Sequence, residues 1–71
     1  MTQWPSTKAR IVLGALLRMG WVIKRQSGTS HRVLARNGWS DFVFAFHERD
    51  EIGPVMLARI ARRTGLTPND L

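Results

Sequence analysis

The chain of 71 residues has no cysteine, no long apolar run and no acidic residue among its first 36 positions. The absence of cysteine excludes disulfides, thiolate chemistry and cysteine-based zinc sites. A membrane-spanning helix needs about 20 consecutive apolar residues, so no membrane association is expected. The start of the chain, residues 1–5, lacks the basic residues and apolar stretch of a signal peptide, which predicts a cytoplasmic protein.

The length predicts one domain over residues 1–71. The sequence contains no internal repeat, low-complexity tract or linker. So short a chain leaves few residues to line a large pocket, and no small-molecule cofactor is expected.

Positive charge is concentrated in the first half of the chain. Residues 1–36 hold seven Lys and Arg, whereas residues 37–71 hold four Arg and five acidic residues, and the net charge is +6. A positive surface on a small domain favours a polyanionic partner, and nucleic acid is the usual one. The charge alone also permits an acidic protein partner.

Two amphipathic segments predict helices. The first is expected to begin near Ser6 or Thr7, either of which can cap it, and to end at Gly20. The second is expected to begin at Pro54 and end at Gly65. The apolar stripe of the first helix comprises Val12, Ala15, Leu16 and Met19, and that of the second comprises Met56, Leu57, Ile60 and Ala61. The residues at 67–70 predict a short capped terminal turn.

Between the helices, residues 21–26, 31–36 and 41–47 are rich in β-formers and predict three strands. Asn37-Gly38 is typical of a hairpin turn, although a bulge near Trp39-Ser40 is an alternative. Residues 48–53 predict a polar, acidic loop beside the second helix, whose dipole favours negative charge.

The predicted order is therefore α-β-β-β-α, an α+β fold. Both helices are expected on one face of a three-stranded antiparallel sheet. This architecture is that of the double-stranded-RNA-binding domain, which contacts duplex RNA mostly through shape and backbone.

Several segments together resemble the HicA-like (YcfA-like) family. These are Gly20-Trp21 after the first helix, Ser30-His31 at the second strand, Phe46-His47 at the end of the third, and the tail LARIARRTGLTPNDL. The match spans nearly the whole chain in order and spacing. The sequence departs from the family pattern at Thr29, which separates Gly28 from Ser30-His31, and at residues 52–54, where many members have Lys-Gly-Thr.

The resemblance implies the toxin of a toxin–antitoxin pair. Such toxins are small domains like the double-stranded-RNA-binding domain that cut messenger RNA, and a HicB-like antitoxin silences them. The family's catalytic histidine lies in the Ser-His element, which corresponds to His31.

RNA cleavage needs no metal if the ribose 2′-hydroxyl is the nucleophile. Histidine suits the proton transfers because its ordinary pKa is about 6.5, and a cation such as Arg32, beside His31, suits stabilisation of the phosphate charge. His47 is a candidate partner acid, or it merely caps the strand end. Two histidines without a third or fourth ligand do not make a metal site, so no metal is expected.

Several further residues are candidates for RNA binding, against the alternative of an ordinary solvated surface. They are Lys24, Arg25, Ser30, Arg32, Arg59, Arg62 and Arg63. The three arginines of the second helix have no acid near them between positions 54 and 66, and they also suit an acidic antitoxin. Trp21 is expected in the core, whereas Trp39 is open to either packing or base stacking.

The leading interpretation is a metal-independent endoribonuclease toxin that cuts mRNA. A non-catalytic RNA-binding module of the same fold is the main alternative, and a protein-interaction domain is a third. A helix-turn-helix DNA-binding protein is the least favoured, because the centre of the chain predicts strands.

Overall fold

The computed structural model describes residues 4–71. Residues 1–3, part of the start in which no signal-peptide pattern was found, lie outside the described residues. The elements in chain order are β1 (Thr7–Lys8), α1 (Ala9–Arg18), β2 (Val22–Ser27), β3 (His31–Ala35), β4 (Phe42–Ala45), β5 (Glu51–Ile52), α2 (Pro54–Thr64) and the 3-10 helix η1 (Pro68–Asp70). Neither α1 nor α2 has the length and apolar character needed to cross a lipid bilayer, and the same holds for η1, so residues 4–71 provide no spanning helix.

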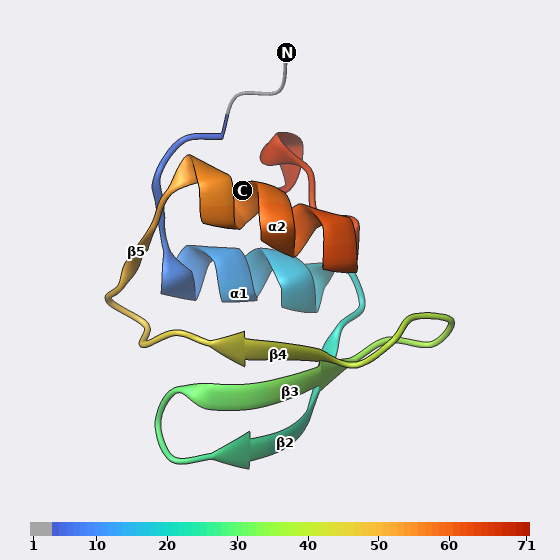
Figure 1. The fold of residues 1–71 in the computed structure, drawn as a ribbon. Coiled ribbons are helices and arrows are strands. Elements are labelled where there is room, and N and C mark those ends of the chain that lie inside the picture. The colour runs from blue at the N-terminus through green and yellow to red at the C-terminus, as the bar shows by residue number, and fades with distance from the viewer. Residues whose placement is uncertain (1–3) are drawn as a thin grey trace.

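The main sheet is antiparallel, with the strand order β2-β3-β4. Both helices lie on the same side of this sheet (Figure 1). The predicted α+β fold with the order α-β-β-β-α is confirmed. The chain adds a feature that the sequence analysis did not predict, a separate two-stranded pairing of β1 with β5.

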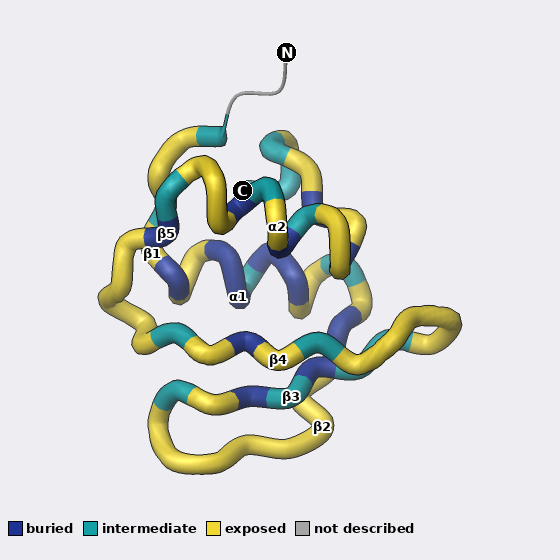
Figure 2. The backbone as a smooth tube through the Cα atoms, viewed as in Figure 1, coloured by how far each residue is buried: buried dark blue, intermediate teal, exposed yellow. Residues whose placement is uncertain are grey.

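The core lies between α1, α2 and the inner face of the sheet, whereas β2 is exposed along its whole length (Figure 2). Trp21 is buried as expected, and its indole Nε1 donates a hydrogen bond to the carbonyl of Thr64 at 3.3 Å. The fully buried side chains are Trp21, Phe44, Leu16, Leu34, Ile52, Leu57, Ile60, Val12 and Thr64.

The apolar stripe of α2 differs from the expected one at two positions. Leu57 and Ile60 are buried, but Met56 is exposed. Thr64 is buried instead, because its hydroxyl donates to the carbonyl of Ile60 at 2.7 Å and needs no water. Pro54 begins the helix and Gly65, with φ of +79°, ends it, as predicted.

The predicted start of the first helix is wrong. Neither Ser6 nor Thr7 caps α1, and the Thr7 hydroxyl donates instead to the carbonyl of Pro5 at 2.7 Å. The helix begins at Ala9, whose amide donates to the carbonyl of Asp50 at 2.7 Å, and the Arg10 amide donates to that of Glu48 at 3.1 Å. Backbone carbonyls distant in sequence thus satisfy two of the free amides of the first turn, in place of a side-chain cap.

The acidic segment before α2 is likewise not a simple loop. Glu51 and Ile52 form β5 and pair with Lys8 and Thr7. Ile52 is buried, and this pairing places residues 48–50 against the beginning of α1. The acidic segment thus lies at the N-terminal end of α1 as well as before α2.

The connection between β3 and β4 is longer than a two-residue hairpin. The amide of Trp39 donates to the carbonyl of Arg36 at 3.0 Å, which closes a turn around Asn37-Gly38. The sheet irregularity lies in β2, between Ile23 and Arg25, and not at the alternative position near Trp39-Ser40.

Candidate functional site

His31 is the first residue of β3, directly after the turn that joins β2 to β3. It pairs with Ser27 of β2 on one side and with Ala45 of β4 on the other. Its side chain is exposed. The imidazole therefore lies at one end of the sheet, where a large polymer has access to it.

Arg32 does not share the face of His31, which corrects the expectation that the two act side by side. Successive side chains of a strand point to opposite faces, and the burial of β3 alternates accordingly. His31 is exposed, whereas Arg32 is 7% exposed and points toward the helices with Leu34. The charge that the sequence placed beside His31 belongs to the inner face of the sheet.

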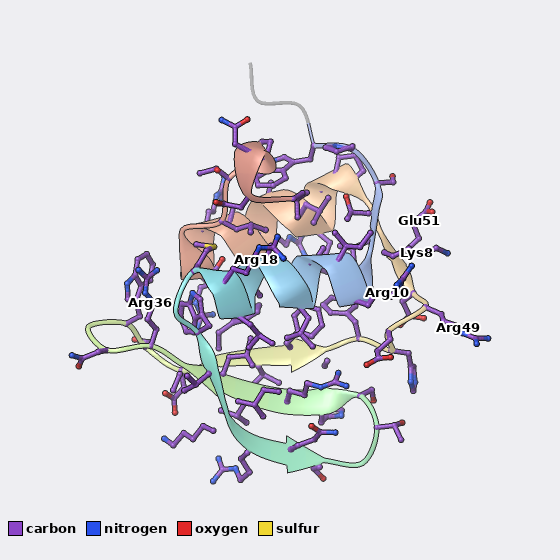
Figure 3. All side chains as sticks on the ribbon, turned by 180° about the vertical axis from the view of Figure 1, so that it is seen from behind. Lys8, Arg10, Arg18, Arg36, Arg49 and Glu51 are labelled. Carbon is purple, nitrogen blue, oxygen red and sulfur yellow. The ribbon has the colours of Figure 1, made fainter. Side chains whose placement is uncertain are left out.

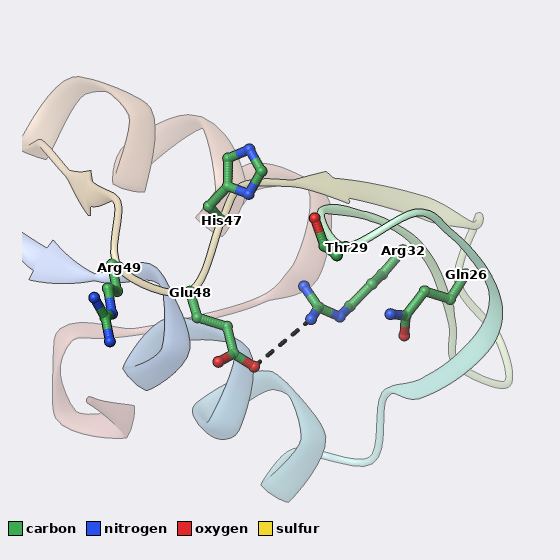
Figure 4. A pocket seen from close by; sticks show the side chains of 6 residues that line it. All are labelled: Gln26, Thr29, Arg32, His47, Glu48 and Arg49. Atoms are coloured by element: carbon green, nitrogen blue, oxygen red, sulfur yellow. Dashed lines mark ion pairs between the residues drawn. The ribbon is translucent and has the colours of Figure 1, made fainter.

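Arg32 lines an open cavity of about 410 Å³ at this end of the sheet (Figure 4). The cavity lies between the β2–β3 turn and the segment that follows β4. It is lined by Gln26, Thr29, Arg32, His47, Glu48 and Arg49. Within this cavity, Arg32 Nη2 lies 3.7 Å from Glu48 Oε1. His47 is exposed on the opposite wall, so the structure brings together the second histidine and Arg32.

The segment that carries His47 and Glu48 is held in place by its own backbone. The amide of His47 donates to Asp50 Oδ2 at 2.9 Å, and the amide of Asp50 donates to the carbonyl of His47 at 3.0 Å. The carbonyls of Glu48 and Asp50 accept the first amides of α1. These hydrogen bonds attach the cavity wall to the beginning of α1 and restrict the backbone at His47.

The candidates on β2 and in the following turn are accessible. Lys24 and Arg25 are exposed, and Ser30 is half-buried. Lys24 Nζ forms an ion pair with Asp41 Oδ2 at 2.8 Å, in which both side chains are solvent-exposed. Such exposed pairs contribute little free energy, so a phosphate can replace Asp41 at small cost.

The candidates on α2 form an exposed basic face. Arg59, Arg62 and Arg63 are all exposed. The guanidinium of Arg63 lies 6.0 Å from the ring centre of Phe42, the first residue of β4. This face is on a different part of the molecule from the cavity, because none of its arginines lines that cavity.

A further basic edge follows the start of α1, and the sequence analysis did not single it out. Lys8, Arg10 and Arg49 extend from this edge near Glu51 (Figure 3). A second cavity, of about 460 Å³, is lined by Lys8, Arg10, Glu48 and Arg49. Glu48 and Arg49 border both cavities, so the two are neighbours on this edge.

Trp39, which the sequence left open, is partly packed. It is 43% exposed and meets Trp21 edge to face, with 5.9 Å between ring centres. The guanidinium of Arg36 lies 5.7 Å from its ring centre. The ring also abuts Gly65. The ring therefore contacts Trp21 at the rim of the core while much of it stays exposed, and both packing and base stacking are open to it.

Gln26, Glu48 and Arg49 are the cavity residues that sequence reasoning missed. The alternation of side chains along β3 was enough to predict that Arg32 and His31 lie on opposite faces of the sheet. The proximity of Glu48 was not readable, because it depends on how the segment after β4 attaches to α1.

The comparisons with known proteins give one match. A family model described as "HicA toxin of bacterial toxin-antitoxin" matches residues 9–66, which include every element from α1 to α2 and the whole cavity. No curated protein and no solved structure matches the chain. A toxin of this kind implies an antitoxin as its partner. The chain belongs to the HicA toxin family of bacterial toxin–antitoxin systems.

Proposed function

We propose that this toxin is a metal-independent endoribonuclease that cuts mRNA in the cytoplasm, with His31 as its catalytic residue. The observation that carries the proposal is the exposed imidazole at the start of β3, within the segment that matches the toxin family. Strand pairing on both sides fixes the backbone at His31 and leaves its side chain open to a bound RNA strand.

The chemistry requires three actions. A base removes the proton of the ribose 2′-hydroxyl, the 2′-oxygen bonds to phosphorus as the bond to the 5′-oxygen breaks, and an acid protonates that leaving oxygen. Neutral imidazole performs the first action and imidazolium the last. His31 takes one of these roles, and His47, two residues beyond its strand partner Ala45, is the accessory candidate for the other.

Contacts with the RNA backbone position the strand rather than react with it. The proposed contact residues are Lys24, Arg25, Ser30, Arg32, Arg59, Arg62 and Arg63. The chain's excess of positive charge supports binding of a polyanion. A HicB-like protein is the proposed antitoxin.

Cleavage of a long single-stranded RNA in EDTA tests this function. Native protein, His31→Ala and His47→Ala are compared on this RNA and on a fully 2′-O-methylated strand, which lacks the nucleophile. We expect the native protein to cut only the unmodified RNA and His31→Ala to cut neither. If the native protein binds RNA without cutting it, the alternative of a non-catalytic RNA-binding module replaces the proposal.

A further inference from the structure

Arg32 is a buried cation whose ion pair with Glu48 is a long one. Its side chain is 8% exposed, and its Nη1 atom has no hydrogen-bond acceptor within residues 4–71. The nearest carboxylate oxygen, Glu48 Oε1, lies 3.7 Å from Nη2, which is beyond hydrogen-bonding distance. A buried guanidinium with an unsatisfied donor lowers the stability of the fold. The presence of Arg32 is therefore not explained by a contribution to stability.

Glu48 is a weak partner for this guanidinium. Its side chain is 63% exposed and extends from the turn that follows β4. A carboxylate so well hydrated loses little when it turns outward. The ion pair therefore neutralises Arg32 in the free protein without blocking access to it from the cavity.

The cavity around Arg32 offers further donors. Thr29 presents a hydroxyl and Arg49 a second guanidinium (Figure 4). Gln26 also borders the space, although its amide nitrogen donates to the carbonyl of Gly28 at 3.3 Å. Donors converging from several sides suit a group with several acceptor oxygens.

Positive charge continues beyond the cavity. Arg49 borders both hollows of the edge, and Lys8 and Arg10 line the second one. Lys8 Nζ donates to the carbonyl of Arg49 at 3.3 Å, which orders this side of the edge. Three exposed cations therefore lie along this edge, beside the exposed carboxylates of Glu48, Asp50 and Glu51.

We propose that this cavity is a binding site for one phosphate group of a bound RNA strand, with Arg32 as the buried anchor and Glu48 as an internal competitor. The inference rests on the proposed function. Arginine binds phosphate through two parallel hydrogen bonds, a geometry that the single distant Glu48 oxygen does not offer. The phosphate replaces Glu48 and provides an acceptor for Nη1.

The anchor phosphate differs from the one that is cut. His31 and Arg32 lie on opposite faces of β3, so one phosphate cannot contact both side chains. The strand therefore passes around the end of the sheet at residues 28–30, with one phosphate held on the inner side and another presented to His31. The site fixes the register of the strand and leaves the chemistry to the outer face.

Nuclear magnetic resonance of the arginine side chains tests the site directly. Native protein is titrated with inorganic phosphate and, separately, with a 2′-O-methylated single strand that binds but is not cut. We expect the Arg32 signals to shift in both titrations, and the strand to displace inorganic phosphate. A shift with phosphate that the strand does not displace contradicts an RNA site, and the absence of a shift in both titrations overturns the proposal.

Three variants complete the test, with Arg18→Gln as the control of equal charge change. Arg18 lies at the far end of α1 and donates to the carbonyl of Asp70. We expect Arg32→Met to bind the methylated strand at least about tenfold more weakly than the control, the loss typical of hydrogen bonds to a charged group. We expect Glu48→Gln to bind it roughly threefold more tightly, because the competitor is removed.

Each outcome bears on the proposal. Circular dichroism checks that Arg32→Met is folded. If Arg32→Met does not fold, Glu48→Gln still tests the site, because that variant retains Arg32. Equal binding by Arg32→Met and Arg18→Gln, or weaker binding by Glu48→Gln, overturns the phosphate site. Cleavage that depends on His31 stands in that case, whereas a native protein that binds through Arg32 without cutting refutes the proposed function alone.

Discussion

His31 and Arg32 are neighbours in the chain whose side chains leave opposite faces of β3. The exposed imidazole lies on the outer face, and the guanidinium is buried in a cavity on the inner face. The two faces of β3 therefore have different proposed roles in this toxin. One face supplies proton transfer, and the other supplies a cation that holds the strand.

Replacement of Arg32 with Met is expected to leave the free energy of unfolding unchanged or to raise it. Among residues 4–71 the buried guanidinium has no acceptor for Nη1 and a carboxylate only at 3.7 Å, so an apolar side chain of similar length removes a cost. Thermal and urea unfolding measure the change. A loss of about 3 kcal/mol or more, typical of a broken buried ion pair, indicates that Arg32 has a structural role instead.

Gly14 and Gly65 are expected to respond to alanine with opposite signs. Gly65 has φ of +79°, and an added Cβ atom lies 3.0 Å from the Trp39 ring, so Gly65→Ala lowers stability. The left-handed conformation alone costs about 1–2 kcal/mol. Gly14 lies inside α1, where the nearest atom to an added Cβ is the flexible Arg18 side chain at 3.6 Å.

Gly14→Ala is therefore expected to raise stability by about 0.5–1 kcal/mol, the difference in helix propensity. Chemical unfolding of the two variants beside the native protein measures both changes. Destabilisation by Gly14→Ala contradicts the packing described for α1. An unchanged stability of Gly65→Ala contradicts the left-handed conformation of Gly65 at the end of α2.

Trp21→Phe is expected to lower stability by about 1–3 kcal/mol, because the buried carbonyl of Thr64 loses its donor and the smaller ring leaves a void. Trp39→Phe serves as the comparison, since Trp39 is 43% exposed. Its smaller loss is read from the same unfolding curves. Equal losses at the two positions are inconsistent with their different burial.

Much of the fold is readable from local sequence because its signals act over a few residues. Pro54 and Gly65 begin and end α2 where predicted. The capping box of Thr67 and Asp70 is present at η1. The start of α1 and the pairing of β1 with β5 were not predicted, because carbonyls some 40 residues away determine them.

The candidate site divides in the same way. The position of His31 at a strand end follows from the turn before it, and its exposure from strand alternation. The contact of Arg32 with Glu48 depends on a turn that is itself attached to α1. No local pattern near either residue reports that attachment.

Arg62→Gln is expected to reduce the salt dependence of binding to single-stranded RNA. Arg62 lies on the exposed basic face of α2, and each phosphate contact on a single strand contributes about 0.7 to the slope of log K against log salt. Binding isotherms at several salt concentrations give the slope, with Arg18→Gln as the control. A slope equal to that of the native protein removes Arg62 from the RNA interface.

His31 is the residue proposed to perform proton transfer in metal-free RNA cleavage. The most direct measurement is the single-turnover cleavage rate of native protein and His31→Ala in EDTA, with both proteins saturated by RNA. We expect a rate at least about 100-fold lower for the variant, the usual contribution of a general acid or base, with an unchanged unfolding midpoint because the side chain is exposed. Equal rates for the two proteins, or cleavage that EDTA abolishes, would contradict that proposal.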